Sequence, residues 1–143
     1  GLGDVYKRQV YKCGVGEDGR RTFEFIQNIF TLRRDHRVNS AATDIMLTKD
    51  GEHLLCSNAG DNSVTIYKID KDNGTLSILS SLPISGDYPK YINLFPDEKH
   101  LMSMNHDGNS ITFFTVHWDK GLIVMSGREV RISKPNNMVI RKL

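Results

Sequence analysis

The sequence predicts an all-β protein built from repeated four-stranded sheets, the architecture of a β-propeller, and three observations lead to this prediction. Two stretches nearly superimpose at a spacing of 47 residues: DGEHLLCSN at 50–58 is followed by DEKHLMSMN at 97–105, and NSVTIY at 62–67 by NSITFF at 109–114. β-Branched and aromatic residues fill the predicted strands, and no apolar stripe with a helical period reaches helix length. A four-stranded repeat of about 40–50 residues has the size of one propeller blade.

Each repeat is expected to contain four short strands in a meander. In the first repeat we expect strands near residues 44–48, 53–57, 63–69 and 75–83. Turn residues separate them, with KDG at 49–51, GDN at 60–62 and DNG at 72–74. The strands lack in–out alternation, as expected for sheets that neighbouring blades cover on both faces. A β-sandwich is the main alternative, but a sandwich would not repeat a four-strand unit at nearly constant length.

The repeat predicts two complete blades, over residues 41–84 and 85–131. We expect them to be superimposable sheets without a helix longer than two turns. Residues 1–9 are set apart from the fold, because GLGDVYKRQ looks like translated adaptor sequence and the chain does not begin with Met.

Composition and charge restrict the classes of function. The chain has 143 residues, of which 38% are hydrophobic and 25% charged, as in a soluble protein with a core. The 19 Lys and Arg residues are scattered among 17 Asp and Glu residues, so a nucleic-acid partner is not predicted. The apolar runs are a few residues long, against about 20 needed to cross a bilayer, so no membrane span is expected.

The two cysteines, Cys13 and Cys56, fit neither a disulfide scaffold nor a CxxC motif, and we expect buried or idle thiols. This indicates a reducing compartment, and no secretory signal pattern is visible, so a cytoplasmic location is expected. No HxH, HExxH or GxSxG motif occurs. The sequence therefore predicts no metal, no cofactor and no serine nucleophile.

Several segments after residue 9 together resemble one known family. They are SAATDI at 40–45, DGEHLLCSN at 50–58, NSVTIYKID at 62–70, YPKYI at 88–92 and KPNNMVIRKL at 134–143. Through them the chain resembles the seven-bladed lactonase propellers, which include bacterial 6-phosphogluconolactonases and fungal carboxymuconate cyclases. The resemblance is to the C-terminal third or more of that family.

The resemblance implies a propeller fragment with two complete blades and partial blades at each end. A partial blade is expected over 10–38, with a third strand near 10–12 and a fourth near 23–29. A closing strand over 135–143 would insert into the first blade of the ring, so the missing N-terminal blades of the same propeller are the expected partner. The implied function is a lactone hydrolase that acts on a sugar lactone by base-assisted attack of water, with the fragment inactive alone.

Two positions depart from the family pattern. Lys90 follows Pro89 where the family usually has Arg, and Ala59 follows Asn58 where it also usually has Arg. Each change removes a guanidinium that could bind a carboxylate or phosphate through two parallel hydrogen bonds. These departures affect the expected substrate more than the expected fold.

In a four-stranded meander, the loops between the second and third strands lie at the same end as the links between blades. The candidate site residues are expected at this end. Hydrolysis of a lactone needs a base for water, and donors or cations for the oxyanion. The candidate bases are His106 and Asp44, and the candidate substrate-binding donors are Lys90, Asn58, Asn105 and Asn137. An anionic sugar lactone is the expected ligand.

The same residues also have structural interpretations, in which they take no part in binding or catalysis. His106 is also interpretable as a solvated loop histidine, Asp44 as a cap, the asparagines as turn residues, and Lys90 as a surface lysine paired with Asp87. A non-catalytic propeller that serves as a binding or scaffold module is the alternative function, since this fold hosts many activities.

Overall fold

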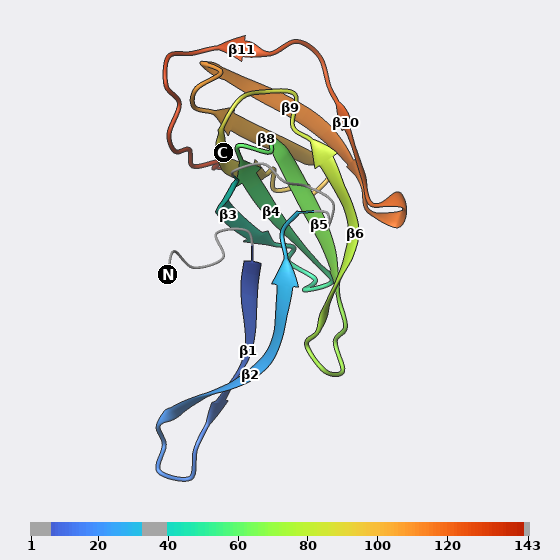
Figure 1. Ribbon diagram of the computed structural model, residues 1–143. Coiled ribbons are helices and arrows are strands. Elements are labelled where there is room, and N and C mark those ends of the chain that lie inside the picture. Colours follow the sequence, from blue (N-terminus) through green and yellow to red (C-terminus); the bar gives the residue numbers. More distant parts are fainter. Residues whose placement is uncertain (1–6, 33–39, 142–143) are drawn as a thin grey trace.

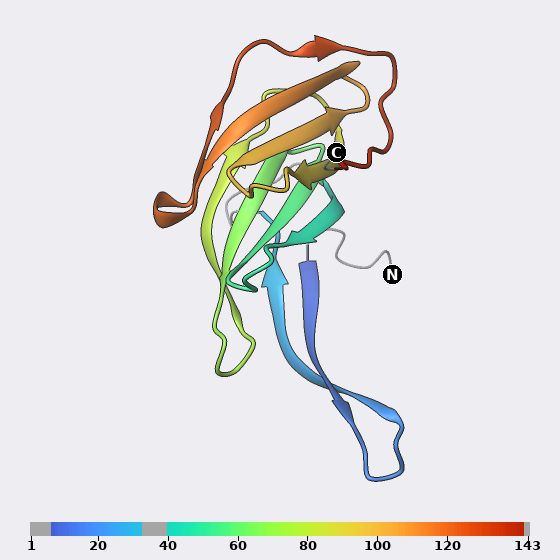
Figure 2. The same cartoon turned by 180° about the vertical axis from the view of Figure 1, so that it is seen from behind.

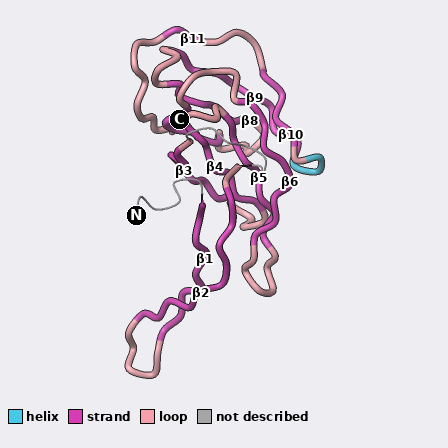
Figure 3. Tube along the Cα trace, viewed as in Figure 1, coloured by secondary structure: helices cyan, strands magenta, loops and turns pink. Residues whose placement is uncertain are grey.

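The computed structural model describes residues 7–32 and 40–141, which form three antiparallel sheets (Figure 1). Apart from one turn of 3₁₀ helix, η1 (Trp118–Lys120), the regular structure of these residues is strand (Figure 3). None of their helical segments is long and apolar enough to span a bilayer. The prediction of an all-β fold is confirmed.

The second sheet, which we call the upstream blade, is a four-stranded meander in the order β3-β4-β5-β6. Its strands are β3 (Ala41–Leu47), β4 (His53–Ala59), β5 (Ser63–Ile69) and β6 (Leu76–Pro83). These bounds agree with the predicted strands to within three residues. Gly51 and Gly74 lie in the turns before β4 and β6 with φ of 68° and 75°, a conformation that glycine adopts without a clash of a Cβ atom.

The third sheet, the downstream blade, repeats the meander with one difference. Its strands are β7 (Pro89–Leu94), β8 (His100–Asn105), β9 (Ser110–His117), β10 (Leu122–Met125) and β11 (Val130–Arg131). The expected fourth strand is divided, because β10 pairs with the end of β9 and β11 with its beginning. Ser126 still donates its backbone N–H to the carbonyl of Phe113, and residues 127–129 then leave the sheet, where Gly127 has a φ of 73°. Within the described residues neither blade contains a helix of two turns, as expected.

The first sheet is a hairpin of β1 (Lys7–Val15) and β2 (Arg21–Phe30), at the positions expected for third and fourth strands of a preceding blade. The turn end of the hairpin extends away from the two blades in both views (Figures 1 and 2). Lys7 pairs with Phe30 and Gln9 with Asn28, so β1 begins inside the segment 1–9 that was set apart from the fold. The prediction for residues 7–9 was wrong, because neither the absence of Met nor an adaptor-like composition carries information on strand pairing. Residues 1–6 lie outside the described part.

The predicted closing strand does not form in the described part of the chain after β11. Residues 132–141 have no strand, and their side chains Met138 and Ile140 instead pack beside Met102 and Met104 on the outer face of the downstream blade. A strand exists only where a partner backbone lies alongside it. Insertion into a first blade concerns residues outside this chain and stays a prediction.

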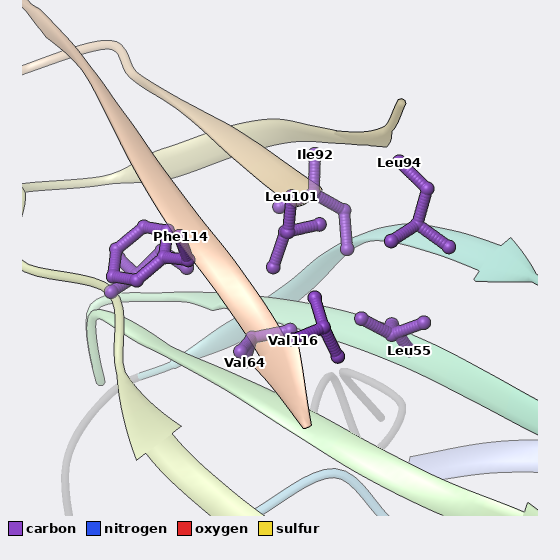
Figure 4. Packing of buried hydrophobic residues seen from close by; sticks show 8 residues of the cluster. Leu55, Val64, Ile92, Leu94, Leu101, Phe114 and Val116 are labelled. Carbon is purple, nitrogen blue, oxygen red and sulfur yellow. The ribbon is translucent and has the colours of Figure 1, made fainter. Parts of the chain in front are cut away.

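The two blades pack face to face through one apolar cluster (Figure 4). The upstream blade and the link that follows it contribute Leu55, Val64 and Ile84, and the downstream blade contributes Ile92, Leu94, Leu101, Phe114 and Val116. The other face of the upstream blade packs on the hairpin through a second cluster that contains Cys56, Tyr67 and Leu76. Because both faces are covered, β4 and β5 each contain five consecutive buried residues, which explains why the sequence shows no alternation.

A repeated hydrogen bond fixes the passage from one blade to the next. The side-chain oxygen of Asn62, in the β4–β5 loop, accepts from the backbone N–H of Tyr88 at 2.9 Å. Asn109, 47 residues later, accepts in the same way from Lys134 at 3.0 Å. Tyr88 and Lys134 have φ of 57° and 46°, and each precedes a proline. An L-residue rarely adopts this conformation, so the asparagine stabilises a specific path of the link.

We expect the 143-residue chain on its own to self-associate, because it leaves large apolar side chains uncovered. Val15 and Phe23 of the hairpin are 73% and 65% exposed, and Ile45 and Leu47 of β3 are 50% and 56% exposed. Exposed apolar surface and unpaired strand edges favour association. Light scattering after size exclusion should show species above 16.2 kDa that grow with concentration. A monomer with one sharp unfolding transition would contradict this expectation.

Candidate functional site

Three segments meet at one end of the blades, which we call the blade-link end. They are the β8–β9 loop (106–109), the link before β7 (84–88) and the segment after β11 (132–137). The backbone N–H of His106 donates to the carbonyl of Tyr88 at 2.9 Å, and their rings lie 6.4 Å apart. The sequence therefore located His106 and the Pro89–Lys90 step at the same end of the fold.

His106 is half-buried, and its contact with a backbone carbonyl determines which ring nitrogen carries the proton. Its Nδ1 lies 3.2 Å from the carbonyl oxygen of Pro135. A carbonyl oxygen only accepts hydrogen bonds, so Nδ1 carries a proton and, in the neutral ring, the lone pair is on Nε2. A histidine oriented in this way can accept a proton from water through Nε2.

Lys90 occupies a β-bulge in β7. Pro89 pairs with Asn105 and Tyr91 with Met104, so Lys90 has no partner in the register. Its side chain is exposed and makes no hydrogen bond or ion pair with residues 7–32 or 40–141. Asp87, the ion-pair partner considered for it, instead accepts from the amide of Asn62 at 2.9 Å. A bulge changes the direction of a side chain relative to its strand, and here it presents a free ammonium.

Asp44 links the two blades. One of its carboxylate oxygens accepts from the backbone N–H of Ile45 at 2.8 Å, and the other accepts from that of Ile92 in β7 at 3.0 Å. Its own N–H donates to the hydroxyl of Ser57 at 3.1 Å. Because both oxygens hold backbone amides, we revise its interpretation from a general base to a residue that joins β3 to β7.

Asn58 is fully buried in the upstream blade. Its side-chain N–H group donates to the carbonyl of Thr31 at 2.9 Å, and lies 3.2 Å from the hydroxyl of Ser63 and 3.3 Å from that of Thr65. Further blades could only bury the side chain more. This burial argues against the substrate-binding role expected for Asn58 and supports a structural one.

Asn105 repeats this arrangement in the downstream blade. Its side-chain N–H group lies 3.3 Å from the hydroxyl of Ser110 and 3.1 Å from that of Thr112, which donates to the carbonyl of Ile84 in the preceding link. Asn105 is also fully buried. The signal was present in the sequence, because each asparagine recurs with its serine and threonine at a spacing of 47 residues.

The two asparagines differ at their carbonyl oxygens. Oδ1 of Asn105 accepts from the hydroxyl of Ser103 at 2.8 Å, whereas buried Oδ1 of Asn58 has no hydrogen-bond partner among the described residues. The residue equivalent to Ser103 is Cys56, a buried thiol whose pKa is raised by its burial. The upstream blade therefore lacks one donor that the downstream blade has.

We expect Cys56→Ser to raise the stability of the protein by about 1 kcal/mol, because its hydroxyl would satisfy Oδ1 of Asn58. The matched change Ser103→Ala removes the same donor from Asn105 and should lower stability by about 1–3 kcal/mol. Thermal or denaturant unfolding of both variants measures these effects. Two changes of the same sign would show that this donor does not decide stability.

Asn137 lies at the blade-link end, two residues after the proline that contacts His106. Its side chain is exposed, and Oδ1 accepts from the backbone N–H of the adjacent Met138 at 2.7 Å. Its amide N–H group makes no hydrogen bond to the described residues. The structure therefore brings Asn137, His106 and Lys90 to one end, leaves Asp44 between the blades, and buries Asn58 and Asn105.

A crevice of about 390 Å³ lies at the opposite end, between the turns of the two blades. Its lining includes His53, Lys68 and Trp118, and none of the predicted site residues. The His53 ring lies 4.9 Å from that of Trp118, and the indole N–H donates to the carbonyl of Glu98 at 2.8 Å. His53 thus packs against Trp118 at the end opposite the blade links.

The blade repeat and the geometry of its links agree with a comparison of sequences. The model of the family described as "Lactonase, 7-bladed beta-propeller" matches residues 7–140. The chain belongs to this lactonase family. The resemblance seen in the sequence is confirmed, and the match begins at Lys7, where β1 begins.

Individual relatives of this lactonase chain are longer than it is. A curated 6-phosphogluconolactonase from Formosa agariphila is 30% identical over 81 residues, which are 55% of this chain and 22% of the relative. A solved putative 6-phosphogluconolactonase from Bacteroides fragilis is 25% identical with a TM-score of 0.76, covering 92% of this chain and 35% of that one. A periplasmic gluconolactonase from Pseudomonas aeruginosa shares the fold, with a TM-score of 0.82 at 16% identity over 93% of this chain and 36% of that one. The lactonase chain thus spans about a fifth to a third of these relatives.

Proposed function

We propose that the protein containing this chain hydrolyses an anionic sugar lactone, as the names of its relatives suggest. The observation that carries the proposal is Lys90, an exposed ammonium without a partner among the described residues, on a bulge at the blade-link end. His106 and Asn137 supply a base and a donor at the same end. An unpaired cation attracts an anionic ligand and stabilises negative charge that develops near it.

In the proposed reaction His106 accepts a proton from water through Nε2 while the water oxygen attacks the lactone carbonyl. The carbonyl π electrons move to oxygen, and the ammonium of Lys90 stabilises this oxyanion. When the carbonyl re-forms, the ring C–O bond breaks, and the leaving alkoxide takes the proton from His106. The product is the open-chain sugar acid, and neither an oxidant nor a metal ion enters the balance.

The whole protein tests this proposal directly. Hydrolysis of a 6-phosphorylated gluconolactone should exceed the spontaneous rate, and the neutral gluconolactone should be hydrolysed with a lower kcat/KM, because only the first carries a negative charge that the Lys90 ammonium attracts over a distance. Release of acid is followed with a pH indicator. A rate equal to the spontaneous one for both lactones would favour the alternative of a non-catalytic binding or scaffold propeller. The residue at position 59 supports this alternative. Ala59 is buried and offers no polar side chain at the other position where the family usually has Arg.

A reducing, cytoplasmic location is part of the proposal. Cys13 is exposed and Cys56 buried, and neither is in a disulfide. An exposed unpaired thiol is compatible with a compartment that keeps thiols reduced.

A further inference from the structure

The bulge that carries Lys90 is held on both sides by the upstream blade. The hydroxyl of Thr43 donates to the carbonyl of Pro89 at 2.6 Å, immediately before Lys90. The carboxylate of Asp44 accepts from the N–H of Ile92 at 3.0 Å, two residues after Lys90. The backbone around the ammonium is therefore fixed by two adjacent side chains of β3.

These two side chains are themselves anchored to the buried part of the upstream blade. The hydroxyl of Thr43 lies 2.9 Å from that of Ser57, and the N–H of Asp44 donates to the same Ser57 hydroxyl. Ser57 is fully buried in β4. Thr43 is the bulge residue of β3, since Ala42 pairs with Asn58 and Asp44 with Ser57. The bulge of one blade thus supports the bulge of the next.

This pair of contacts does not belong to the common architecture of a blade. The positions 47 residues after Thr43 and Asp44 are Lys90 and Tyr91, which do not repeat it: the Lys90 side chain makes no hydrogen bond with the described residues, and Tyr91 has no carboxylate. Contacts that serve the fold do recur, as between Asn62 and Tyr88 and between Asn109 and Lys134. The Thr43–Asp44 contacts are specific to the place where β7 carries the free cation.

We propose that Thr43 and Asp44 are positioning residues that set the direction of the Lys90 ammonium, an inference that rests on the proposed lactone chemistry. Attraction of an anionic substrate acts over long distances and tolerates small displacements of a charge. Stabilisation of an oxyanion requires a donor within hydrogen-bond distance, and displacements of about 1 Å are costly. A loosened bulge therefore lowers kcat more than it raises KM.

The test uses Thr43→Val in the whole protein, which removes the hydroxyl and retains the shape of the side chain. The expected result is a fall in kcat of about tenfold with KM changed less than about twofold, and Thr43→Ser should retain the wild-type value. In a Lys90→Ala background, Thr43→Val should cause no further loss, because the group that it positions is absent. Asp44→Asn, which removes the charge but not the shape, should give the same pattern and serves if Thr43→Val does not fold.

Thr115→Val is the matched control. It removes a hydroxyl contact of similar length, 2.8 Å to Ser126, in β9 and away from β7, and should leave kcat unchanged. The proposal would be overturned if the losses of kcat in Thr43→Val and Lys90→Ala multiplied in the double variant. It would also be overturned if Thr115→Val lowered kcat as much as Thr43→Val does. If the wild-type protein hydrolyses no lactone, the proposed function fails, and a crystal structure of Thr43→Val decides this inference separately. An unchanged Lys90 bulge in that structure would then overturn it.

Discussion

Replacing Asn105 with Ala is expected to lower the free energy of unfolding by about 3 kcal/mol, the largest effect on stability that we predict. The amide of Asn105 contacts three buried hydroxyl groups, those of Ser103, Ser110 and Thr112. Each buried group left without its partner costs about 1–3 kcal/mol, and the hydroxyls can recover part of this by rotating to other acceptors. Thermal unfolding of the whole protein should show a Tm lower by several degrees.

Asn137→Ala provides the matched control, since this asparagine is exposed and its side chain bonds only to the adjacent backbone. Its effect should stay within about 0.5 kcal/mol. Equal Tm values for the two variants would show that the buried amide of Asn105 contributes no more than an exposed one. That result would reopen the earlier interpretation of Asn105 as a ligand of the substrate.

Replacing Lys90 with Ala in the whole protein is expected to lower kcat/KM for an anionic lactone about tenfold or more, which corresponds to about 1.4 kcal/mol. The ammonium makes no hydrogen bond or ion pair with the described residues, so its loss should leave Tm nearly unchanged. Lys90→Arg restores the residue that is usual in the family and should preserve or raise activity, because a guanidinium can bind an anion through two hydrogen bonds. Steady-state kinetics with the phosphorylated and neutral lactones measure the effect.

Lys71→Ala removes another exposed ammonium, 2.8 Å from the carboxylate of Glu52 in the turn before β4. It should change kcat/KM by less than about twofold, since that turn is at the end opposite Lys90. Equal losses in Lys71→Ala and Lys90→Ala would indicate that the protein uses its net charge and not a specific cation. Unchanged kinetics in Lys90→Ala would remove Lys90 from the site.

The blades were predictable because a repeat at constant spacing is a property of the sequence alone. The strand bounds, the turns at Gly51 and Gly74 and the shared end of the link residues all follow from it. The divided fourth strand of the downstream blade did not follow, because residues 127–129 leave the sheet where the upstream blade has the continuous strand β6. The absence of a closing strand depends on a partner that this chain does not contain.

The site residues stay predictions, and the repeat divides them into two kinds. Asn58 and Asn105 occupy equivalent positions, and a residue required in every blade serves packing between blades. Lys90 and His106 replace Thr43 and Ala59 at their equivalent positions, so they are not needed for a blade as such. Departure from the repeat thus distinguishes residues that a blade does not need from residues that every blade uses. Asp44 also departs from it, and its contact with Ile92 could be found only from coordinates.

The repeated link between blades has a consequence for the geometry of the whole ring. Asn62 and Asn109 hold Tyr88 and Lys134 in the same unusual backbone conformation before a proline, so the chain leaves the two blades along a similar local path. In a closed propeller the angles between neighbouring blades add up to one full rotation. A short polar connection held by one side-chain amide per blade therefore helps to keep that angle constant, together with the apolar packing between the sheets.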